Sequence, residues 1–198
     1  DIAGNAGATV TALTSGSGVT IDLTAPKLTT VTMVSNNAGN GTLANAGDTI
    51  TVSLTADEAI VAPTVTIAGQ SATVSGSGTS YTAAYTVQAS QVTSLDGKAA
   101  GVSVVFADIA GNSGTPVTSL TGGGTVTIDL TPPTLPSVTI ASDNGADTTR
   151  ANAGDTITLT IVASEAIKTP TVTIAGKAAT VSGSGSSYTA ALILTATE

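Results

Sequence analysis

The chain has 198 residues, of which 41% are hydrophobic, and carries 13 acidic against 5 basic residues, for a net charge of −8. It contains no Cys and no His, which excludes disulfides and leaves no ligands for zinc, haem or iron–sulfur sites. Five basic residues exclude a nucleic-acid-binding surface, and no run of 18 apolar residues is present to span a membrane. The excess of carboxylates instead favours hard divalent cations as partners.

The sequence repeats itself with an offset of 107 residues. Residues 1–91 match residues 108–198 without a gap, which indicates a tandem array of whole domains rather than the short units of solenoids. We expect residues 1–24 to be the C-terminal end (F–G loop and last strand) of a preceding repeat and residues 25–131 to form a complete repeat. Residues 132–198 should form the N-terminal part, about five strands, of the next repeat in a longer protein.

Alternating apolar and Thr or Ser residues predict seven strands within residues 25–131. They are expected at residues 31–33, 50–54, 65–67, 72–74, 81–87, 102–106 and 126–130. A polar loop is expected over residues 36–48 and a helical turn over residues 88–97. Short strands separated by turn residues are typical of immunoglobulin-like Greek-key β-sandwiches, so the predicted fold class is all-β. The small side chains should make each repeat only modestly stable.

A stiff linker is predicted between repeats. It reads Asp22-Leu23-Thr24-Ala25-Pro26 in the first copy and Asp129-Leu130-Thr131-Pro132-Pro133 in the second. Proline fixes φ and holds the preceding residue extended, whereas a Gly/Ser linker would be flexible. Adjacent repeats should therefore lie end to end with a restricted angle.

Carboxylates should converge where this linker meets the repeat, because Greek-key topology places the linker beside the loops that follow the second and sixth strands. The residues concerned are Asp22, Asp57, Glu58, Asp108 and Asn112. Such a group repels itself at neutral pH, and Ca²⁺, which takes 6–8 oxygen ligands, relieves the repulsion better than Mg²⁺. By repetition, Asp129 and Glu165 belong to the next junction, and Asp1 and Asn5 match Asp108 and Asn112.

A simpler interpretation also stands. Asp-Ile-Ala-Gly-Asn can be an ordinary hairpin turn, because Asp and Asn bond their own backbone. Replacement of Asp57 by Ser164 in the second copy also weakens the calcium prediction. A further acidic loop, with Asp143, Asn144 and Asp147, is better explained as a turn, since its first copy has lost these charges.

Three other patterns carry little weight. The Thr-x-Thr runs are better explained as solvent-facing strand residues than as an ice-binding face. Gly122-Gly123-Gly124 predicts a flexible loop, since neither the Lys nor the helix of a phosphate loop follows. A nucleophile–His pair cannot form without His, so an enzyme is the least favoured function.

The motifs Asp-x-Ala-Gly-Asn and Ile-Asp-x-Thr-x-Pro, with Ala-Gly-Asp-Thr-Ile-Thr at 46–51 and 153–158, resemble bacterial immunoglobulin-like repeats of large surface adhesins exported by type I secretion. The resemblance covers the whole chain. It implies an extracellular location at the bacterial cell surface and an extender role in attachment or biofilm formation. It also implies Ca²⁺ at the junctions, held by Asp22, Glu58, Asp108 and Asn112, with Asp57 as a further ligand.

Two other functions compete with the extender, whose partners would be neighbouring repeats of the same chain. A module that binds glycans or a host protein is disfavoured, because the three Tyr and one Phe fall mostly at core-facing positions. A self-assembling subunit of a filament or surface layer would use other copies of the chain as partners. Residues 132–198 favour it, since an unfinished sandwich exposes a strand edge.

Overall fold

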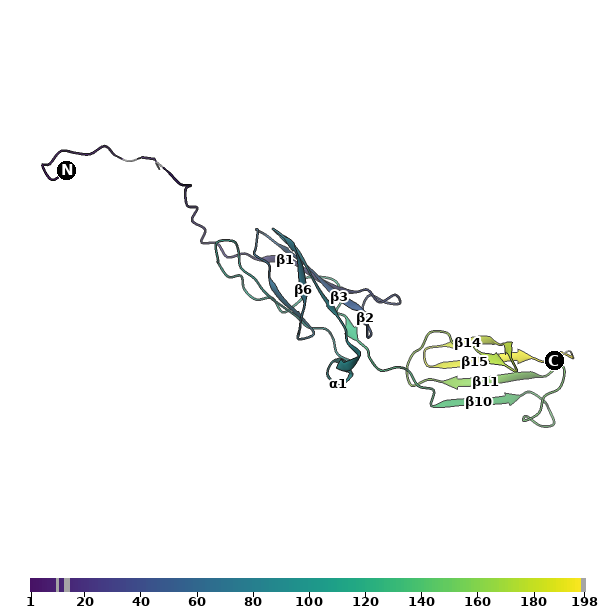
Figure 1. The fold of residues 1–198 in the computed structure, drawn as a ribbon. Helices are drawn as coiled ribbons and strands as arrows, with labels where there is room; N and C mark the ends of the chain where they lie inside the picture. The colour runs from purple at the N-terminus through teal and green to yellow at the C-terminus, as the bar shows by residue number, and fades with distance from the viewer. Residues whose placement is uncertain (10, 13–14, 197–198) are drawn as a thin grey trace. The chain divides into compact units, whose positions relative to one another are not determined.

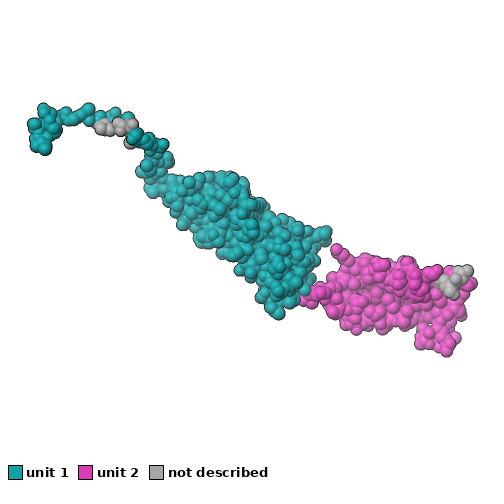
Figure 2. Space-filling model, in the orientation of Figure 1, with its two compact units in different colours: residues 1–130 teal, residues 131–198 magenta. Residues whose placement is uncertain are grey.

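The computed structural model describes residues 1–9, 11–12 and 15–196. The chain forms two compact units, residues 1–130 and 131–198, drawn in different colours in Figure 2. Both are built from β-strands, with one 3₁₀ turn (η1, Ala89–Gln91) and one short helix (α1, Val92–Leu95) in unit 1. The prediction of an all-β chain is confirmed, and the helical turn lies within the predicted residues 88–97.

Unit 1 contains a four-stranded antiparallel sheet and a smaller group of strands (Figure 1). The large sheet has the order β1-β3-β7-β6, with β1 Leu28–Ser35, β3 Thr49–Ala56, β7 Ser80–Thr86 and β6 Thr73–Ser77. The smaller group has the order β5-β4-β8, with β5 Gln70–Ser71, β4 Thr64–Ile67 and β8 Val102–Val105. Two short strands, β2 (Leu43–Ala44) and β9 (Thr127–Ile128), pair in parallel. This strand order is that of an immunoglobulin-type sandwich.

The core of unit 1 follows from the period-2 pattern of its strands. Val31 and Met33 of β1 face Leu54 and Val52 of β3, and none of these four side chains is more than 6% exposed. The intervening Thr and Ser residues face away, where β-branched and hydroxyl side chains suit a solvated sheet surface. The two sheets therefore meet through thin layers of Val, Ile, Leu and Ala.

The predicted polar loop over residues 36–48 is wrong at one point, because it contains β2. Ala44 is 1% exposed and lies opposite Ile128 of β9. The Thr127 N–H donates to the Thr42 carbonyl at 2.8 Å, and the Asp129 N–H donates to the Ala44 carbonyl at 2.9 Å. Two residues are too few to show a period, so sequence pattern alone cannot reveal such a strand.

Unit 2 repeats the large sheet of unit 1. Its order is β10-β11-β15-β14, with β10 Ser137–Ser142, β11 Thr156–Val162, β15 Ser187–Ile193 and β14 Thr180–Ser184. Beside it stands the two-stranded pair β12 (Thr173–Ile174) and β13 (Lys177–Ala178). Within the described part of residues 131–196 no strand corresponds to β8 or β9.

The last strand expected in residues 1–24 is not formed. The structure shows no strand among the described residues before Leu28. Val19 and Ile21 are 91% and 81% exposed, whereas Val126 and Ile128, which match them in the repeat, are fully buried. A strand this short depends on partners to cover it, and nothing in the described chain packs against Val19 and Ile21.

The turn between β4 and β5 holds an alanine in a left-handed conformation. Ala68 has φ 52° and Gly69 has φ 74°, and Ala175 and Gly176 repeat this geometry with φ 51° and 76°. Two consecutive positive φ values define a type I′ hairpin turn, which favours Asn-Gly because alanine is strained there.

We predict that Ala68→Asn raises the free energy of unfolding of unit 1 by about 0.5–1 kcal/mol, because Asn tolerates this conformation. Ala68→Val should lower it, since a β-branched side chain is more strained there. Urea denaturation of the 198-residue chain, followed through amide NMR signals of β4 and β5, measures both variants. Equal stability of the two variants would contradict the explanation.

Candidate metal site

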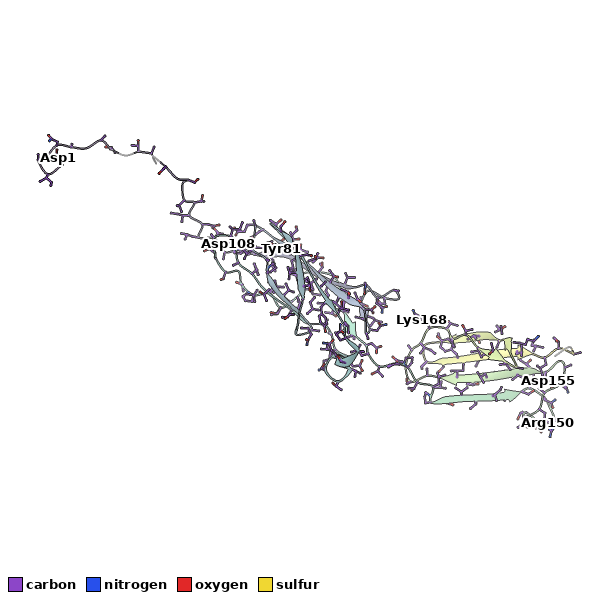
Figure 3. All side chains as sticks on the ribbon, in the orientation of Figure 1. Asp1, Tyr81, Asp108, Arg150, Asp155 and Lys168 are labelled. Atoms are coloured by element: carbon purple, nitrogen blue, oxygen red, sulfur yellow. The ribbon has the colours of Figure 1, made fainter. Side chains whose placement is uncertain are left out.

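Two loops meet at one end of unit 1. The loop after β3 contains Ile60, which forms an antiparallel bridge with Asp108 from the loop after β8, and the Val61 N–H donates to the Ala107 carbonyl at 3.0 Å. The buried Tyr81 hydroxyl donates to the Ile60 carbonyl at 2.8 Å. Tyr81 and Asp108 lie at the same end of the sandwich (Figure 3). These contacts hold the backbone that follows Glu58.

The linker is fixed at the same end. Pro26 is fully buried, and the Asn112 Nδ2 donates to the Asp22 carbonyl at 3.2 Å. The Lys27 N–H donates to Asp57 Oδ1 at 2.8 Å, and the Asp57 N–H donates back to the Lys27 carbonyl at 3.0 Å. The linker is therefore bonded to both loops.

Three carboxylates converge as a result. Asp22, Glu58 and Asp108 each offer one oxygen, and these oxygens lie within 4.8 Å of one another. Asp108 is buried and the other two are half-buried. Ligands on opposite sides of a Ca²⁺ ion, at about 2.3–2.6 Å each, are about 4.6–5.2 Å apart, so one ion can contact all three oxygens.

Asp108 is held by its own turn. Its Oδ1 accepts the N–H groups of Gly111 and Asn112 at 2.7 and 2.8 Å, and its Oδ2 accepts the Asn112 Nδ2 at 2.7 Å. Burial on its own would raise the pKa of Asp108, but the hydrogen bonds from Asn112 and the neighbouring backbone outweigh it and lower the pKa. Asp108 is therefore an oriented, ionised carboxylate.

Glu58 differs from Asp108, because its pKa is raised rather than lowered. Partial burial and then the negative charges of Asp22, Asp108 and Asp57 raise its pKa. No hydrogen bond to its carboxylate offsets these effects among the residues that the structure describes.

Asn112 and Asp57 make hydrogen bonds beside the cluster, and their role as ligands stays a prediction. Asn112 directs its amide nitrogen at Asp108 and at the Asp22 carbonyl, so it positions two members of the cluster. Asp57 is exposed and bonds the Lys27 N–H. In unit 2 the Ser164 Oγ accepts the Thr134 N–H at 2.9 Å in the same way. Replacement of Asp57 by Ser164 therefore preserves a backbone contact, and Asp57 contributes to the cluster through its charge.

The remaining predicted ligands lie outside the cluster. Asp1 and Asn5 form the same turn as Asp108 and Asn112, with the Ala3 and Asn5 N–H groups on Asp1 Oδ1 at 2.9 Å, but both are exposed. Asp129 follows β9 in unit 1 and Glu165 follows β11 in unit 2, so the second junction stays a prediction. In the described chain, Asp22, Glu58 and Asp108 form the acidic group with metal-binding geometry.

The second acidic loop is a turn, as preferred above. Asn144 Oδ1 accepts the N–H groups of Ala146 and Asp147, and the Thr149 N–H and hydroxyl bond Asp147. In the first copy, Asn37 and Asn40 accept the equivalent bonds. The bonds form with either Asn or Asp, so backbone geometry explains this loop.

Sequence reasoning missed the residues that position the cluster. Tyr81 was assigned to the core alone, yet its hydroxyl fixes the loop that carries Glu58. The signal was available in the repeat, because Tyr188 recurs and donates to the Ile167 carbonyl at the same 2.8 Å.

Comparison with protein-family models and with curated proteins gave no match for this chain. In the described residues, no helix has the length and apolar character needed to cross a membrane.

We predict that Glu58→Gln stabilises metal-free unit 1 at neutral pH. A raised folded-state pKa means that the folded state binds the Glu58 proton more tightly than the unfolded state, so this contribution to stability is present below pH 4.5 and lost as pH rises through the folded pKa. The urea midpoint of the variant in chelator should exceed that of the wild type at pH 7, and the difference should disappear below pH 4. An equal difference at both pH values would contradict the raised pKa of Glu58.

Asp57→Ser should leave the stability of unit 1 close to that of the wild type, because Ser retains the bond that Ser164 makes in unit 2. Asp57→Ala should cost about 0.5–1.5 kcal/mol, the usual value of one hydrogen bond. Urea denaturation in chelator compares the two. A Ser variant as unstable as the Ala variant would contradict the role assigned to the side-chain oxygen as acceptor of the Lys27 N–H.

Proposed function

We propose that this chain is a structural extender whose repeats are stiffened by Ca²⁺ at their junctions. The observation that carries the proposal is the position of Asp22, Glu58 and Asp108 at the point where the linker joins unit 1. A cation bound there would tie the linker to two loops of the sandwich. Its role would be to cross-link these segments electrostatically, and the proposed function is mechanical rather than catalytic.

The path of the chain through unit 1 supports this role. The linker joins at the end that carries Tyr81 and Asp108 (Figure 3). The chain leaves beside α1, at the opposite end (Figure 1), where the Leu130 N–H donates to Asp96 Oδ1 at 2.6 Å. A domain whose two connections lie at opposite ends adds its full length to an array, which suits a spacer.

The donor set suits Ca²⁺. Three carboxylates supply the hard oxygen ligands that it prefers, and water and backbone carbonyls can complete its shell. The raised pKa of Glu58 and the lowered pKa of Asp108 describe an anionic group that a divalent cation would neutralise. Asp22 comes from the linker, so binding there would be coupled to the order of the linker.

The wider setting rests on the resemblance to bacterial adhesin repeats. On that basis we place the chain outside the cell, as part of a surface adhesin that projects a binding region for attachment or biofilm formation. Its immediate partners would be neighbouring repeats of the same protein.

The proposal is tested by calcium titration of the 198-residue chain. Ca²⁺ at about one hundred times its Kd should stabilise unit 1 by about 2.7 kcal/mol. Hydrogen exchange at the amides of Leu23 and Thr24 should slow at the same concentrations. Asp22→Asn should remove both effects. Asp143→Asn, an Asp in the second acidic loop, is the matched control and should retain them. Equal responses of the two variants, or no response of the wild type at millimolar Ca²⁺, would overturn the proposal.

A further inference from the structure

The chain contains two Asn-Gly pairs, one in each copy of the repeat. Asn40-Gly41 lies in the loop after β1, and Asn144-Gly145 lies in the loop after β10. An Asn before Gly is prone to spontaneous deamidation, because glycine has no side chain to shield its amide nitrogen. That nitrogen attacks the Asn side-chain carbonyl carbon, and ammonia leaves. The two pairs can be compared as reactants within one molecule.

Asn40 presents its side chain in a form that suits this reaction. Its Oδ1 accepts the Thr42 N–H at 2.9 Å and the Thr42 hydroxyl at 2.8 Å. Negative charge develops on this oxygen when Cγ is attacked, so both donors stabilise the tetrahedral intermediate. Asn40 is exposed, and among the residues that the structure describes neither its Nδ2 nor the Gly41 N–H has a hydrogen-bond partner. Water can therefore protonate the departing nitrogen.

Asn144 is held by a contact that Asn40 lacks. Its Nδ2 donates to Asp155 Oδ2 at 2.8 Å, and its Oδ1 accepts the Ala146 and Asp147 N–H groups at 3.0 and 3.2 Å. The leaving nitrogen is thus bonded to a carboxylate, and deamidation would bring two carboxylates into contact. A hydrogen bond to a charged group is strong enough that breaking it slows a reaction about tenfold or more.

The same contact recurs in unit 1, where Asn37 matches Asn144. The Asn37 Nδ2 donates to Asp48 Oδ2 at 2.6 Å. Ala38 follows Asn37, so no glycine nitrogen is next to it. The contact that protects Asn144 is therefore a property of the loop itself in both copies.

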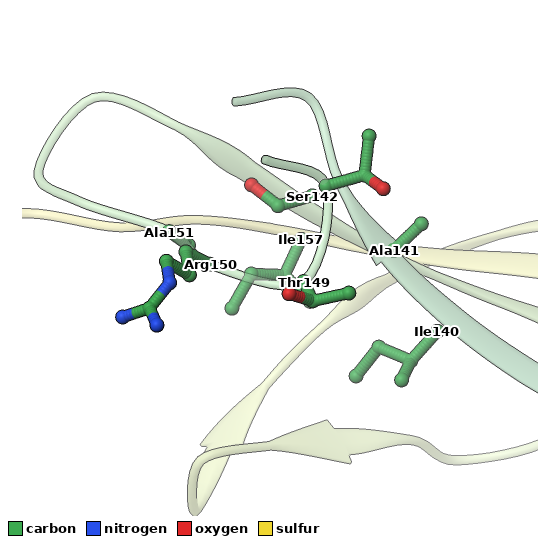
Figure 4. Close-up of a pocket in the computed structure, with 8 residues that line it drawn as sticks. Ile140, Ala141, Ser142, Thr149, Arg150, Ala151 and Ile157 are labelled. Atoms are coloured by element: carbon green, nitrogen blue, oxygen red, sulfur yellow. The ribbon is translucent and has the colours of Figure 1, made fainter. Parts of the chain in front are cut away.

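The loop can accommodate the product of deamidation, because the second copy already carries it. Asp147 matches Asn40, and its Oδ1 accepts the Thr149 N–H at 2.9 Å and the Thr149 hydroxyl at 2.6 Å. Figure 4 shows Thr149 and the next residue, Arg150, in the loop after β10. The Thr149 hydroxyl and N–H lower the pKa of Asp147. An aspartate at residue 40 would accept the same two bonds in its charged form.

A neighbouring side chain favours glycine at residue 41. A Cβ atom there would lie 3.2 Å from Val34 Cγ2 and 3.4 Å from the Ser35 carbonyl oxygen. In the second copy Thr148 matches Gly41 and Ala141 matches Val34, so the smaller alanine leaves room for the threonine side chain. Packing of the loop on β1 therefore favours the reactive pair in the first copy.

We propose that Asn40-Gly41 is a site of spontaneous deamidation in the folded protein, that Asn144-Gly145 is protected, and that unit 1 accepts the Asp product. The bond between Asn40 Cγ and Nδ2 breaks as Gly41 N bonds Cγ, and the Nδ2 group leaves as ammonia with the Gly41 amide proton. Water then opens the succinimide ring. Cleavage at Cγ gives Asp and restores the Gly41 N–H, and cleavage at the main-chain carbonyl gives isoaspartate. Unit 1 gains one negative charge.

Incubation of the 198-residue chain in mildly alkaline buffer tests the proposal. Peptide mass spectrometry follows both asparagines in the same sample, so Asn144 is the internal control. Asn40 should convert at least about tenfold faster than Asn144, because Asn144 must first leave Asp155. The two rates should converge in guanidinium chloride, since both residues precede glycine. Equal rates in the folded chain, or a tenfold difference that persists in the denaturant, would overturn the proposal.

Two variants test the chemistry and the product separately. Gly41→Ala should slow the conversion of Asn40 at least about tenfold and leave that of Asn144 unchanged, because a methyl group shields the attacking nitrogen. Val34 is 53% exposed, so its side chain can move aside for this methyl group. Asn40→Asp should retain the urea midpoint of unit 1. Unchanged conversion in Gly41→Ala, or a lowered midpoint in Asn40→Asp, would overturn the proposal.

Discussion

Covering one face of a four-stranded sheet is the constraint on which each unit depends. Ile50 and Ile128 are fully buried in unit 1, where strands close over the β1-β3-β7-β6 sheet. Unit 2 has the same four strands in the same order, yet Ile140 is 61% exposed. A fully buried Ile or Val contributes about 1.5–3 kcal/mol, so each covered side chain is a large share of the stability of a core built from small side chains.

The strand that completes this cover also leads into the linker. β9 ends at Ile128, and the next residue, Asp129, donates its N–H to the Ala44 carbonyl at 2.9 Å. At the other end of the unit, Pro26 is buried and follows Asp22 by four residues. Packing of the core therefore fixes the backbone beside Asp22 at one end of unit 1 and beside Asp129 at the other. The positions of these two carboxylates thus depend on the packing of the core.

Much of this arrangement could be predicted from the sequence. The offset of 107 residues defined the repeat, and alternation located the main strands, because period-2 burial is a local property of sequence. Greek-key topology predicts that Asp22, Glu58 and Asp108 share one region, and their oxygens lie within 4.8 Å of one another. These features depend on patterns that extend over many residues.

The features that could not be predicted depend on single contacts. The β2–β9 pair is two residues long and has no period. The orientation of Asn112 follows from its bonds to Asp108 and Asp22, which lie four and 90 residues away. Asp57 is predicted to be a ligand because it lies in the same loop as Glu58, but its bond to Lys27 depends on where the linker crosses the loop. The residue types indicate that these side chains can bind a cation or close a turn, but the tertiary contacts decide which of these roles each residue has.

Three of the acidic residues at the linker have different roles. Asp108 closes its own turn, and Asp57 makes a backbone contact that a serine makes equally well in unit 2. Turn chemistry accounts for both. Glu58 is different, because its pKa is raised by burial and by its acidic neighbours, and in the described chain no hydrogen bond offsets this cost. In the second copy Glu165 matches Glu58, whereas Ser164 stands at the position of Asp57. A destabilising carboxylate that recurs beside a replaceable one supports the proposed calcium site, and this proposal therefore depends most on Glu58.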